Sequence, residues 1–280
     1  MIMPDRIIAK PLAGLSNKLR VIESVVSLAR DLGCPVEIIW SPDWQMVAHY
    51  SDLFEPSDLF RVTDRDRLKY CRSSFSLKNY KKPVSRMINR YHGIDLVFNE
   101  VDISRQVRTG NWDIRALAKG KTSYINTCHN FYPYHYNFSW IRPVPAIAGN
   151  VARFEQIIKD KKCIGLHIRR TDNITSIESS PDSLFEAAVR DEIDRDPAVV
   201  FFLATDDSAT QSHFINLFGR ERMLVHPKKF GRDSVDATQD AVVDWILLTG
   251  CSKLYCSYYS SFSETVIAVS KAPAITLKIQ

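Results

Sequence analysis

A cluster of polar side chains ends an apolar run in the segment from Cys163 to Asp172, which reads CIGLHIRRTD. The cluster contains His167, Arg169, Arg170 and Asp172. An arginine stays charged at any working pH, and its planar fork of N–H donors matches a phosphate or diphosphate group. The spacing therefore indicates an anion site. The alternative is that the two arginines are ion-paired residues at the edge of a sheet.

A β-strand is the element that must position this cluster. The apolar residues of the segment alternate with His167 and Arg169, a period of two that puts these two side chains on one face of a strand. The polar residues follow where the apolar run stops, so they lie at the carboxyl end of an expected core strand. Open α/β sheets bind their ligands at that edge.

Two carboxylates lie at the end of the next expected strand. The apolar run from Ala198 to Ala204 leads through Thr205 into Asp206 and Asp207. Such carboxylates can accept hydrogen bonds from ribose hydroxyls or from the N–H groups of a guanine base. The alternative is an interaction with the dipole of the helix expected from Ser208. Asp206 is nearer the strand, which favours a ligand role for it.

A hydroxyl-rich helix start follows the expected strand from Leu254 to Cys256. Ser261 and Glu264 have the spacing of a capping box, which marks the start of a helix. Free N–H groups and hydroxyls at such a position suit a diphosphate, although a capping box needs no ligand. The candidate residues here are Ser260, Ser261, Phe262 and Ser263.

The first residues predict a strand, a helix and a second strand. The strand from Arg6 to Leu12 runs into the turn Gly14 to Asn17, a helix follows, and Pro35 to Trp40 reads as the next strand. This order predicts a parallel sheet. In the turn, Gly14 would allow close backbone approach, and Ser16 or Asn17 could cap the helix. Gly14 and Asn17 are candidates to face an anion or a sugar, although such turns also occur without a ligand.

Aromatic residues fill alternate positions of the segment from Tyr132 to Trp140. If the segment is extended, their rings share one face, which suits either packing in the core or stacking on sugar rings, and core packing is favoured. The candidate acceptor contacts in this segment are Tyr134, His135 and Tyr136.

Two prolines after the aromatic segment indicate a linker. Pro143 and Pro145 break the pattern, and with Ala146 to Asn150 they form the best candidate for a connection between two halves. We expect an acceptor-side domain over residues 1–149 and a nucleotide-sugar-binding domain over residues 150–280.

Basic residues are unevenly placed along the chain. The 280 residues carry a net charge of +5, and the stretch from Arg61 to Arg90 contains ten Lys or Arg against two Asp. Such a stretch favours an anionic partner, for example phosphate groups, an acidic glycan or a membrane surface; a solvated loop is the alternative. Regularly interleaved aromatic residues are lacking there, so we expect no nucleic-acid partner.

Cysteine and aspartate spacing gives no sign of a metal. The six cysteines lack metal-ligand spacing and read as reduced core residues. The triplets Asp64 to Asp66 and Asp194 to Asp196 each enclose an arginine and close no apolar strand, so we interpret them as surface charge. Neither a signal peptide nor a membrane span is evident. We therefore expect a cytoplasmic protein, with peripheral membrane contact through the basic stretch as one use of its charge.

Three segments together resemble a known family. HIRRTD from His167, ATDD from Ala204 and DWILLTGCSKLYCSYYSSFS from Asp244 are similar to the three C-terminal motifs of the fucosyltransferase superfamily. Its members include the α1,6-fucosyltransferases, the rhizobial nodulation fucosyltransferase, the bacterial α1,2-fucosyltransferases and the protein O-fucosyltransferases. The turn Gly14 to Asn17 is similar to their G-x-x-N turn, and the H-x-R-R-x-D motif resembles the α1,6 branch most closely.

The resemblance implies an α/β fold of the GT-B type, with two Rossmann-like halves whose parallel sheets face across a cleft. It implies GDP-fucose as the donor substrate, inversion at the anomeric carbon, no metal and no further cofactor. Arg169 would hold the β-phosphate of the leaving GDP, with His167 and Arg170 shaping the same pocket. Asp206 would face guanine or ribose, the serines Ser260, Ser261 and Ser263 would bind the phosphates, and Asn17 would complete the cleft.

The sequence departs from the α1,6 pattern at the position of the general base. Asn173 stands where a Lys directly follows the motif's aspartate, and Glu178 falls one place beyond the family's Glu. Arg169, Asp172 and Glu178 are the catalytic candidates, the last two as general bases. A base is dispensable if the acceptor hydroxyl attacks a well-developed cation.

The leading hypothesis is transfer of L-fucose from GDP-fucose to a hydroxyl of a glycan or glycolipid. A lipid-linked oligosaccharide or a lipopolysaccharide-type acceptor would suit the basic stretch. Two alternatives stay open: a glycosyltransferase with another GDP-sugar, and a non-catalytic nucleotide-binding or glycan-binding protein.

Overall fold

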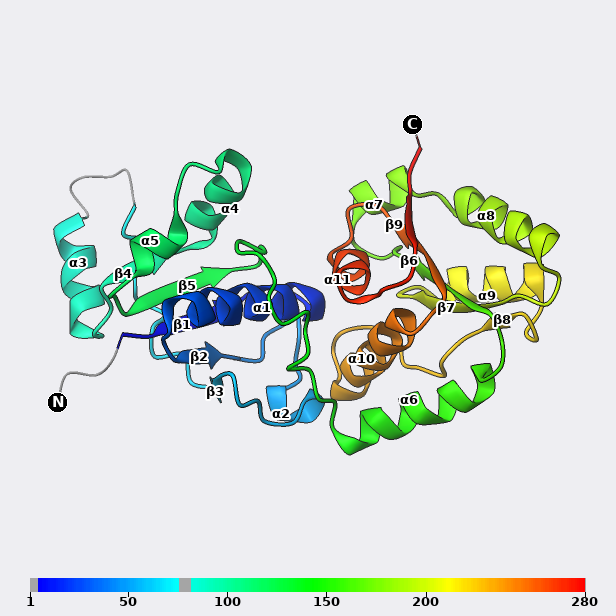
Figure 1. The fold of residues 1–280 in the computed structure, drawn as a ribbon, viewed down its shortest axis with the longest axis horizontal. Coiled ribbons are helices and arrows are strands. Elements are labelled where there is room, and N and C mark those ends of the chain that lie inside the picture. The colour runs from blue at the N-terminus through cyan, green and yellow to red at the C-terminus, as the bar shows by residue number, and fades with distance from the viewer. Residues whose placement is uncertain (1–4, 76–81, 280) are drawn as a thin grey trace. The chain divides into compact units, whose positions relative to one another are not determined.

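The computed structural model describes residues 5–75 and 82–279, which form two compact units, residues 1–142 and 143–280 (Figure 1). Each unit contains a five-stranded sheet in which every pair of neighbouring strands is parallel. The α/β class expected from the alternation of strands and helices is confirmed. The units divide after Arg142, and the segment Ala146 to Asn150, expected as a linker, belongs to a helix.

The N-terminal unit has the strand order β3-β2-β1-β5-β4. The strands are β1 (Ile7–Pro11), β2 (Val36–Ile39), β3 (Arg61–Thr63), β4 (Leu96–Phe98) and β5 (Ser123–Thr127). The helices are α1 (Leu15–Leu32), α2 (Tyr50–Leu53), α3 (Lys82–Tyr91), α4 (Glu100–Thr109) and α5 (Ile114–Ala118). The expected opening of strand, helix and strand is confirmed as β1, α1 and β2.

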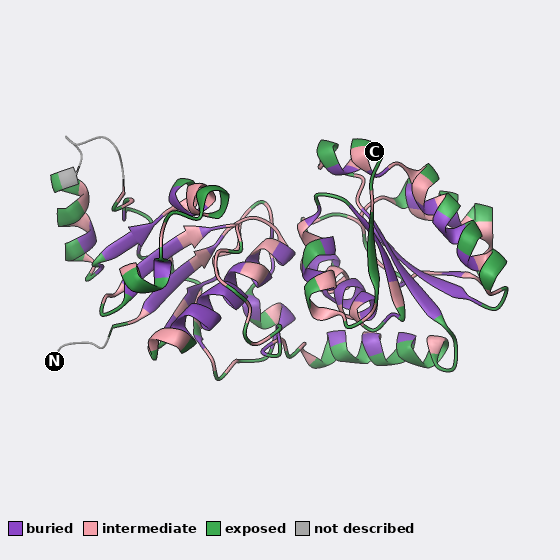
Figure 2. Cartoon of the chain, turned by 45° about the horizontal axis from the view of Figure 1, so that its top comes forward, coloured by how far each residue is buried: buried purple, intermediate pink, exposed green. Residues whose placement is uncertain are grey.

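The C-terminal unit has the strand order β10-β9-β6-β7-β8. Its strands are β6 (Cys163–Ile168), β7 (Val200–Thr205), β8 (Met223–Leu224), β9 (Lys253–Ser257) and β10 (Ala274–Leu277). Its helices are α6 (Pro145–Ile158), α7 (Ile174–Ser179), α8 (Asp182–Arg195), α9 (Ser208–Phe218), α10 (Val235–Thr249) and α11 (Ser261–Val269). In both units the strands are mostly buried, while the helices turn exposed faces outward (Figure 2).

Strand β6 lies at the centre of its sheet, hydrogen-bonded to β7 on one side and β9 on the other. Its apolar alternate residues pack in one core cluster with Phe185 of α8 and Phe214 of α9. On the opposite face, a Cβ at Gly165 would come within 2.9 Å of Leu248 in α10 and 2.7 Å of Leu254 in β9. The glycine therefore lets two leucines pack against the strand that carries His167.

The segment from Phe131 to Trp140 is a loop, so the condition for a shared face of rings, an extended segment, is not met. Asn137 and Phe138 have φ angles of 47° and 59°, which reverse the chain and break the alternation. Phe138 and Trp140 are buried, and Trp140 packs edge-on against Phe60 at 5.4 Å between ring centroids. The rings at the end of the loop are therefore core residues.

Helix α1 begins at a different residue from the one expected. Its N-cap is Gly14, without a side-chain cap, so Ser16 and Asn17 lie inside the first turn instead of capping it. The left-handed backbone conformation falls on Ala13, with a φ of 65°, whereas Gly14 has an ordinary φ of −72°. The tight turn is therefore made by an alanine, and the glycine is not needed for backbone reasons.

Within the described residues, no helix is long and apolar enough to cross a membrane. The six cysteines are free thiols.

Candidate functional site

Arg169 lies just beyond the carboxyl end of β6 and points toward two carboxylates. Its Nη1 atom is 2.7 Å from Oδ2 of Asp206, and its Nη2 atom contacts Oδ1 of Asp172. The Arg169 side chain is 17% exposed, so one side of the guanidinium reaches solvent. The structure therefore brings Arg169, Asp172 and Asp206 together at the sheet edge that the sequence predicted.

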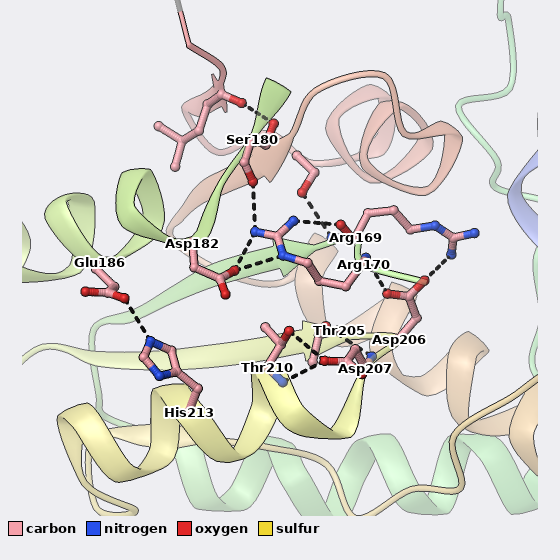
Figure 3. A network of polar contacts seen from close by, with 12 residues as sticks. Arg169, Arg170, Ser180, Asp182, Glu186, Thr205, Asp206, Asp207, Thr210 and His213 are labelled. Atoms are coloured by element: carbon pink, nitrogen blue, oxygen red, sulfur yellow. Dashed lines mark hydrogen bonds and ion pairs between the residues drawn. The ribbon is translucent and has the colours of Figure 1, made fainter. Parts of the chain in front are cut away.

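Arg170 differs from Arg169 because acceptors within the same unit bind its guanidinium (Figure 3). Nε and Nη2 donate to Oδ1 of Asp182 at 2.9 and 2.5 Å, Nη2 also donates to the Ser180 carbonyl, and Nη1 donates to the Arg169 carbonyl. Four of the five N–H donors are thus taken by protein acceptors. Arg170 braces the turn that carries Arg169, and the ion-pair interpretation fits it better than a phosphate contact.

Asp206 fixes the same turn from the neighbouring strand β7. Oδ1 accepts from the Arg170 backbone N–H at 2.7 Å, and Oδ2 accepts from the Thr171 hydroxyl at 2.6 Å. Together with the Arg169 ion pair, these contacts occupy most of its acceptor capacity. In this structure Asp206 positions the arginine turn.

Asp207 is the N-cap of α9. Its Oδ2 accepts from the Thr210 backbone N–H at 2.7 Å and from the Thr210 hydroxyl at 2.8 Å. The backbone hydrogen bond from Thr210 is the largest cause of a lowered pKa for this carboxyl. The carboxylate is committed to the helix start, as the helix-dipole alternative proposed.

His167 is buried between β6 and the start of α11. Its Nδ1 lies 2.7 Å from the Ser263 hydroxyl, and its ring stacks on Phe262 at 4.6 Å between centroids. Burial lowers the pKa of His167 to about 3, and the nearby cations Arg169 and Lys228 also oppose its protonation. At neutral pH its ring is therefore uncharged.

Two serine hydroxyls, one at the end of β9 and one in the first turn of α11, contact the end of β6. The Ser257 hydroxyl accepts from the Arg169 backbone N–H at 3.0 Å, and Ser263 contacts His167. The N-cap is Ser260, whose hydroxyl accepts from the Ser263 backbone N–H, so the cap expected at Ser261 lies one residue earlier. The first-turn N–H groups of Ser261 and Phe262 have no carbonyl partner within the helix, which leaves them suited to an anion.

A second arginine, Arg232, shares Asp172 with Arg169. Its Nη1 and Nη2 atoms lie 3.0 and 3.3 Å from the two carboxylate oxygens of Asp172. Partial burial opposes ionisation of Asp172, but the two guanidinium groups outweigh it and lower the pKa of this carboxyl. Sequence reasoning missed Arg232, because no spacing signal links it to a residue in another loop.

The other base candidate lies apart from this network. Glu178 is an exposed residue of α7 and makes no hydrogen bond or ion pair among the described residues. Asn173, at the position of the family's Lys, is the N-cap of α7: its Oδ1 accepts from the Ser176 N–H and its Nδ2 donates to the Tyr259 carbonyl at 2.7 Å. The substitution thus exchanges a cation for a helix cap.

A buried ion pair lies close to His167. Lys228 Nζ contacts Asp244 Oδ2 at 2.5 Å, and both side chains are under a tenth exposed. Burial raises the pKa of Asp244 even beside this cation. Oδ1 of Asp244 has no hydrogen-bond partner, and it lies 3.7 Å from the equally unpartnered Nδ1 of His226. Sequence reasoning quoted Asp244 within a motif but gave it no role.

A hollow of about 400 Å³ lies beside the start of α11. Ser257, Ser263 and Lys278 contribute polar groups to its wall, and Tyr258 and Tyr259 contribute rings. The structure thus adds space for a ligand next to the two serines that hold the end of β6.

The predicted residues of the N-terminal unit lie at the carboxyl end of β1. Asn17 is in the first turn of α1, and its Oδ1 is buried without a hydrogen-bond partner, as is the Ser16 hydroxyl. Gly14 has open space where a Cβ would be.

The candidate acceptor residues lie along α1. The His135 N–H donates to the Ser27 hydroxyl at 2.9 Å, and the Tyr136 N–H donates to Glu23 Oε1 at 2.8 Å. Tyr134 and Tyr136 are half-buried, and His135 is exposed. Their backbone is therefore fixed while part of each side chain reaches solvent.

Among the described residues, one group has donor atoms close enough to hold a metal ion. The donor atoms belong to Glu100, Cys128 and His129 of the N-terminal unit, and they all lie within 4.8 Å of one another. Glu100 already accepts from the Thr127 hydroxyl and the Cys128 N–H, and it lies 3.0 Å from His129 Nε2. Neither D-x-D triplet belongs to such a group.

No protein-family model matches the sequence, and no match is found among curated proteins. Solved structures do match. The α-1,6-fucosyltransferase NodZ co-crystallised with GDP has a TM-score of 0.66 and 18% identity, over 96% of this chain and 93% of that chain. NodZ structures also include one soaked with GDP-fucose and one from Bradyrhizobium.

Two other proteins show the same likeness. A variant of Arabidopsis thaliana FUT1 in complex with GDP has a TM-score of 0.62 and 11% identity, over 97% of this chain and 70% of that chain. The apo form of POFUT1 has a TM-score of 0.59 and 12% identity, over 100% of this chain and 99% of that chain. The chain therefore has the α/β fold of GT-B fucosyltransferases, as the sequence motifs predicted.

Proposed function

We propose that this protein is a glycosyltransferase that moves L-fucose from GDP-fucose to a hydroxyl of a glycan or glycolipid. The observation that carries the proposal is the arrangement at the end of β6. An arginine held by two carboxylates lies beside a neutral histidine and a serine-rich helix start. Structures of similar fold that contain GDP or GDP-fucose support the choice of donor.

Arg169 is the residue proposed to meet the leaving group. Fucosyl transfer builds positive charge on the sugar and negative charge on the departing diphosphate, so a fixed cation there stabilises the transition state more than the ground state. Asp172 is 54% exposed on its side chain and can turn into solvent when the diphosphate arrives. Arg169 and Arg232 would then both be released toward the phosphate oxygens.

The remaining donor contacts follow from their places in the unit. The N–H groups and hydroxyls of Ser261 and Ser263 would bind phosphate oxygens, with Phe262 and His167 forming an apolar wall. Asp206 would approach the ribose or guanine from β7, and Arg170 and Asp207 would hold the elements that carry these contacts. In the N-terminal unit, we propose Gly14 and Asn17 at the start of α1 as contacts to an anion or a sugar.

We further propose inversion of the anomeric centre without a metal ion. The support is chemical: two arginines can supply the charge that a divalent cation would otherwise bring. Added EDTA should leave turnover unchanged, and a loss of turnover that Zn²⁺ or Mn²⁺ restores would disprove this part. The configuration of the product, read by NMR at the new glycosidic bond, tests inversion separately.

Neither general-base candidate has surroundings that favour proton abstraction. The lowered pKa of Asp172 makes it a weak base in the ligand-free state, and Glu178 is exposed on α7. A mechanism in which the acceptor attacks a developed cation needs little proton abstraction. Tyr134, His135 and Tyr136 are the proposed acceptor contacts, with a lipid-linked oligosaccharide or lipopolysaccharide-type acceptor and a cytoplasmic location.

Thermal-shift titration is the experiment that tests the donor. A ligand that binds only the folded chain raises its melting temperature. GDP and GDP-fucose should each stabilise the chain, whereas UDP-glucose and ADP should not. Equal stabilisation by GDP-mannose would favour another GDP-sugar. Stabilisation by GDP with neither transfer nor slow hydrolysis of GDP-fucose would favour a non-catalytic binding protein.

A further inference from the structure

Helix α3 presents an unusual outer face. Val84, Met87 and Tyr91 are 55%, 68% and 86% exposed, and their spacing of three and four residues places them along one side of the helix. Large apolar side chains that share one exposed face mark a contact surface more often than scattered ones do. We call these three residues the α3 apolar face.

Two arginines flank the α3 apolar face. Arg86 and Arg90 are exposed, and neither forms an ion pair among the described residues. The sequence from Lys82 to Tyr91 contains no Asp or Glu. Residues 76–81, within the wider basic stretch, lie outside the described residues. The helix therefore combines apolar and purely basic groups on its solvent side.

The opposite side of α3 is fixed to the N-terminal unit. Asn89 is 5% exposed, its Oδ1 accepts from the Arg72 N–H at 3.0 Å, and its Nδ2 donates to the Arg72 carbonyl at 2.8 Å. The helix ends at Tyr91, Gly93 then adopts the left-handed conformation, and the Ile94 N–H donates to the Asn89 carbonyl. These bonds hold the apolar face outward without any partner.

We propose that α3 lies on an anionic lipid surface, with Val84, Met87 and Tyr91 inserted at the headgroup boundary. Interfacial helices have this composition: apolar groups on one side, arginine beside them, and no acidic residue. Complementary charge selects lipid over a neutral protein groove, because residues 61–75 and 82–90 hold eight basic residues against two acidic ones. Nucleic acid would be bound by the arginines without need of exposed valine and methionine.

The proposal is independent of the donor, since lipid binding needs no nucleotide. Its meaning for catalysis does rest on the proposed function: a surface-bound enzyme meets a lipid-linked acceptor at raised local concentration. Failure of the lipid-binding proposal does not imply failure of the proposed function, because vesicle binding and GDP binding are measured separately.

Flotation with vesicles tests the proposal directly. The full chain is mixed with vesicles of phosphatidylcholine, with or without phosphatidylglycerol, at low and high salt. We expect binding to the anionic vesicles that weakens as salt rises. A substitution pair Arg86→Gln and Arg90→Gln should weaken it about 30-fold, from roughly 1 kcal/mol for each basic residue. The triple change Val84→Ser, Met87→Ser and Tyr91→Ser should weaken it at least about tenfold at either salt concentration.

Matched substitutions on α6 provide the control. Arg153→Gln and Ile157→Ser change an exposed arginine and a 51% exposed isoleucine away from α3, and they should leave vesicle binding unchanged. Melting temperatures verify folding, and the single change Met87→Ser serves if the triple variant fails to fold. Absence of wild-type binding to anionic vesicles, or full binding by the triple variant, overturns the proposal. The proposal would also be overturned if the wild type did not bind vesicles but self-associated or bound RNA, and if the same variants lost that binding.

Discussion

The Nη1 atom of Arg169 lies 2.7 Å from Oδ2 of Asp206, so a strand-end arginine is held by a carboxylate from the neighbouring strand. The same carboxylate accepts from the Arg170 backbone and from Thr171. Asp206, directly after β7, thus orients the cation and fixes the turn that carries it.

Arg169→Ala should lower turnover with little effect on folding. A lost contact to developing charge costs about 3 kcal/mol, or roughly 10² to 10³ in rate. The guanidinium is partly exposed and makes no contact that the core requires. Steady-state transfer from GDP-fucose measures the loss, and Arg190→Ala on the surface of α8 is the control that should retain activity. Wild-type turnover by Arg169→Ala would remove the arginine from the mechanism.

Arg170→Ala should instead destabilise the unit. It leaves Asp182 and the Ser180 carbonyl without their donors, and only 10% of the Arg170 side chain is exposed. Because Asp182 is 35% exposed and can be solvated, we expect a loss of roughly 2 kcal/mol, below that of a fully buried pair. Urea denaturation measures it. An unchanged midpoint would mean that the brace contributes nothing.

His167→Gln should reduce the acid sensitivity of folding. The unfolded histidine takes up a proton near its ordinary pKa of 6.5, whereas burial holds the folded pKa at about 3. Between these values the unfolded chain binds the extra proton, so the free energy of unfolding falls as pH falls. Denaturation at about pH 7 and about pH 5 should show a smaller difference in the variant than in the wild type. An equal difference would contradict the assignment.

Arg232→Gln should weaken donor binding without affecting stability. Arg232 is 40% exposed, and among the described residues Asp172 is its one ion-pair partner, so we expect folding not to need it. A charged hydrogen bond to phosphate contributes about 1.5 kcal/mol, which corresponds to a rise of about tenfold in the Kd for GDP. Calorimetry measures the Kd. Arg220→Gln, an exposed arginine after α9, should leave the Kd unchanged, whereas equal loss in both variants would indicate a general charge effect.

Glu23→Gln should loosen the aromatic loop. The buried carboxylate accepts from the Tyr136 N–H, the Phe138 N–H and Trp140 Nε1, and a glutamine would turn its own NH₂ group against one of these donors. The expected loss in free energy of unfolding is about 2 kcal/mol. Tryptophan fluorescence and thermal denaturation measure it. A variant as stable as the wild type, with unchanged fluorescence, would contradict this role.

The sequence predicted the elements whose burial is periodic and the sheet edge where they end. The run in β6 alternates between two packed faces, and the run in β7 is buried on both, so their periods are readable. Strand β4 has only Leu96 to Phe98, too short for any period to show. It was therefore missed, together with the short helices around it.

The site was predictable by location but not by role. Arg169 and Arg170 are adjacent and identical in type, and only the fold shows that Asp182 and Ser180 occupy the second. Arg232 reaches Asp172 from a loop 60 positions away, which no local spacing reveals. The aromatic loop was misjudged for the same reason, since Glu23, which bends it, lies on another element.

Glu23 has a consequence for how this fold can diverge. Its partners in the loop include the backbone N–H groups of Tyr136 and Phe138, and Ser27 binds that of His135 in the same way. Backbone amides are present in every residue except proline, so the anchor tolerates almost any side chain at positions 134–136. Side chains at positions 134–136 can therefore change during evolution, for example toward a new acceptor, while the backbone path of the loop stays the same.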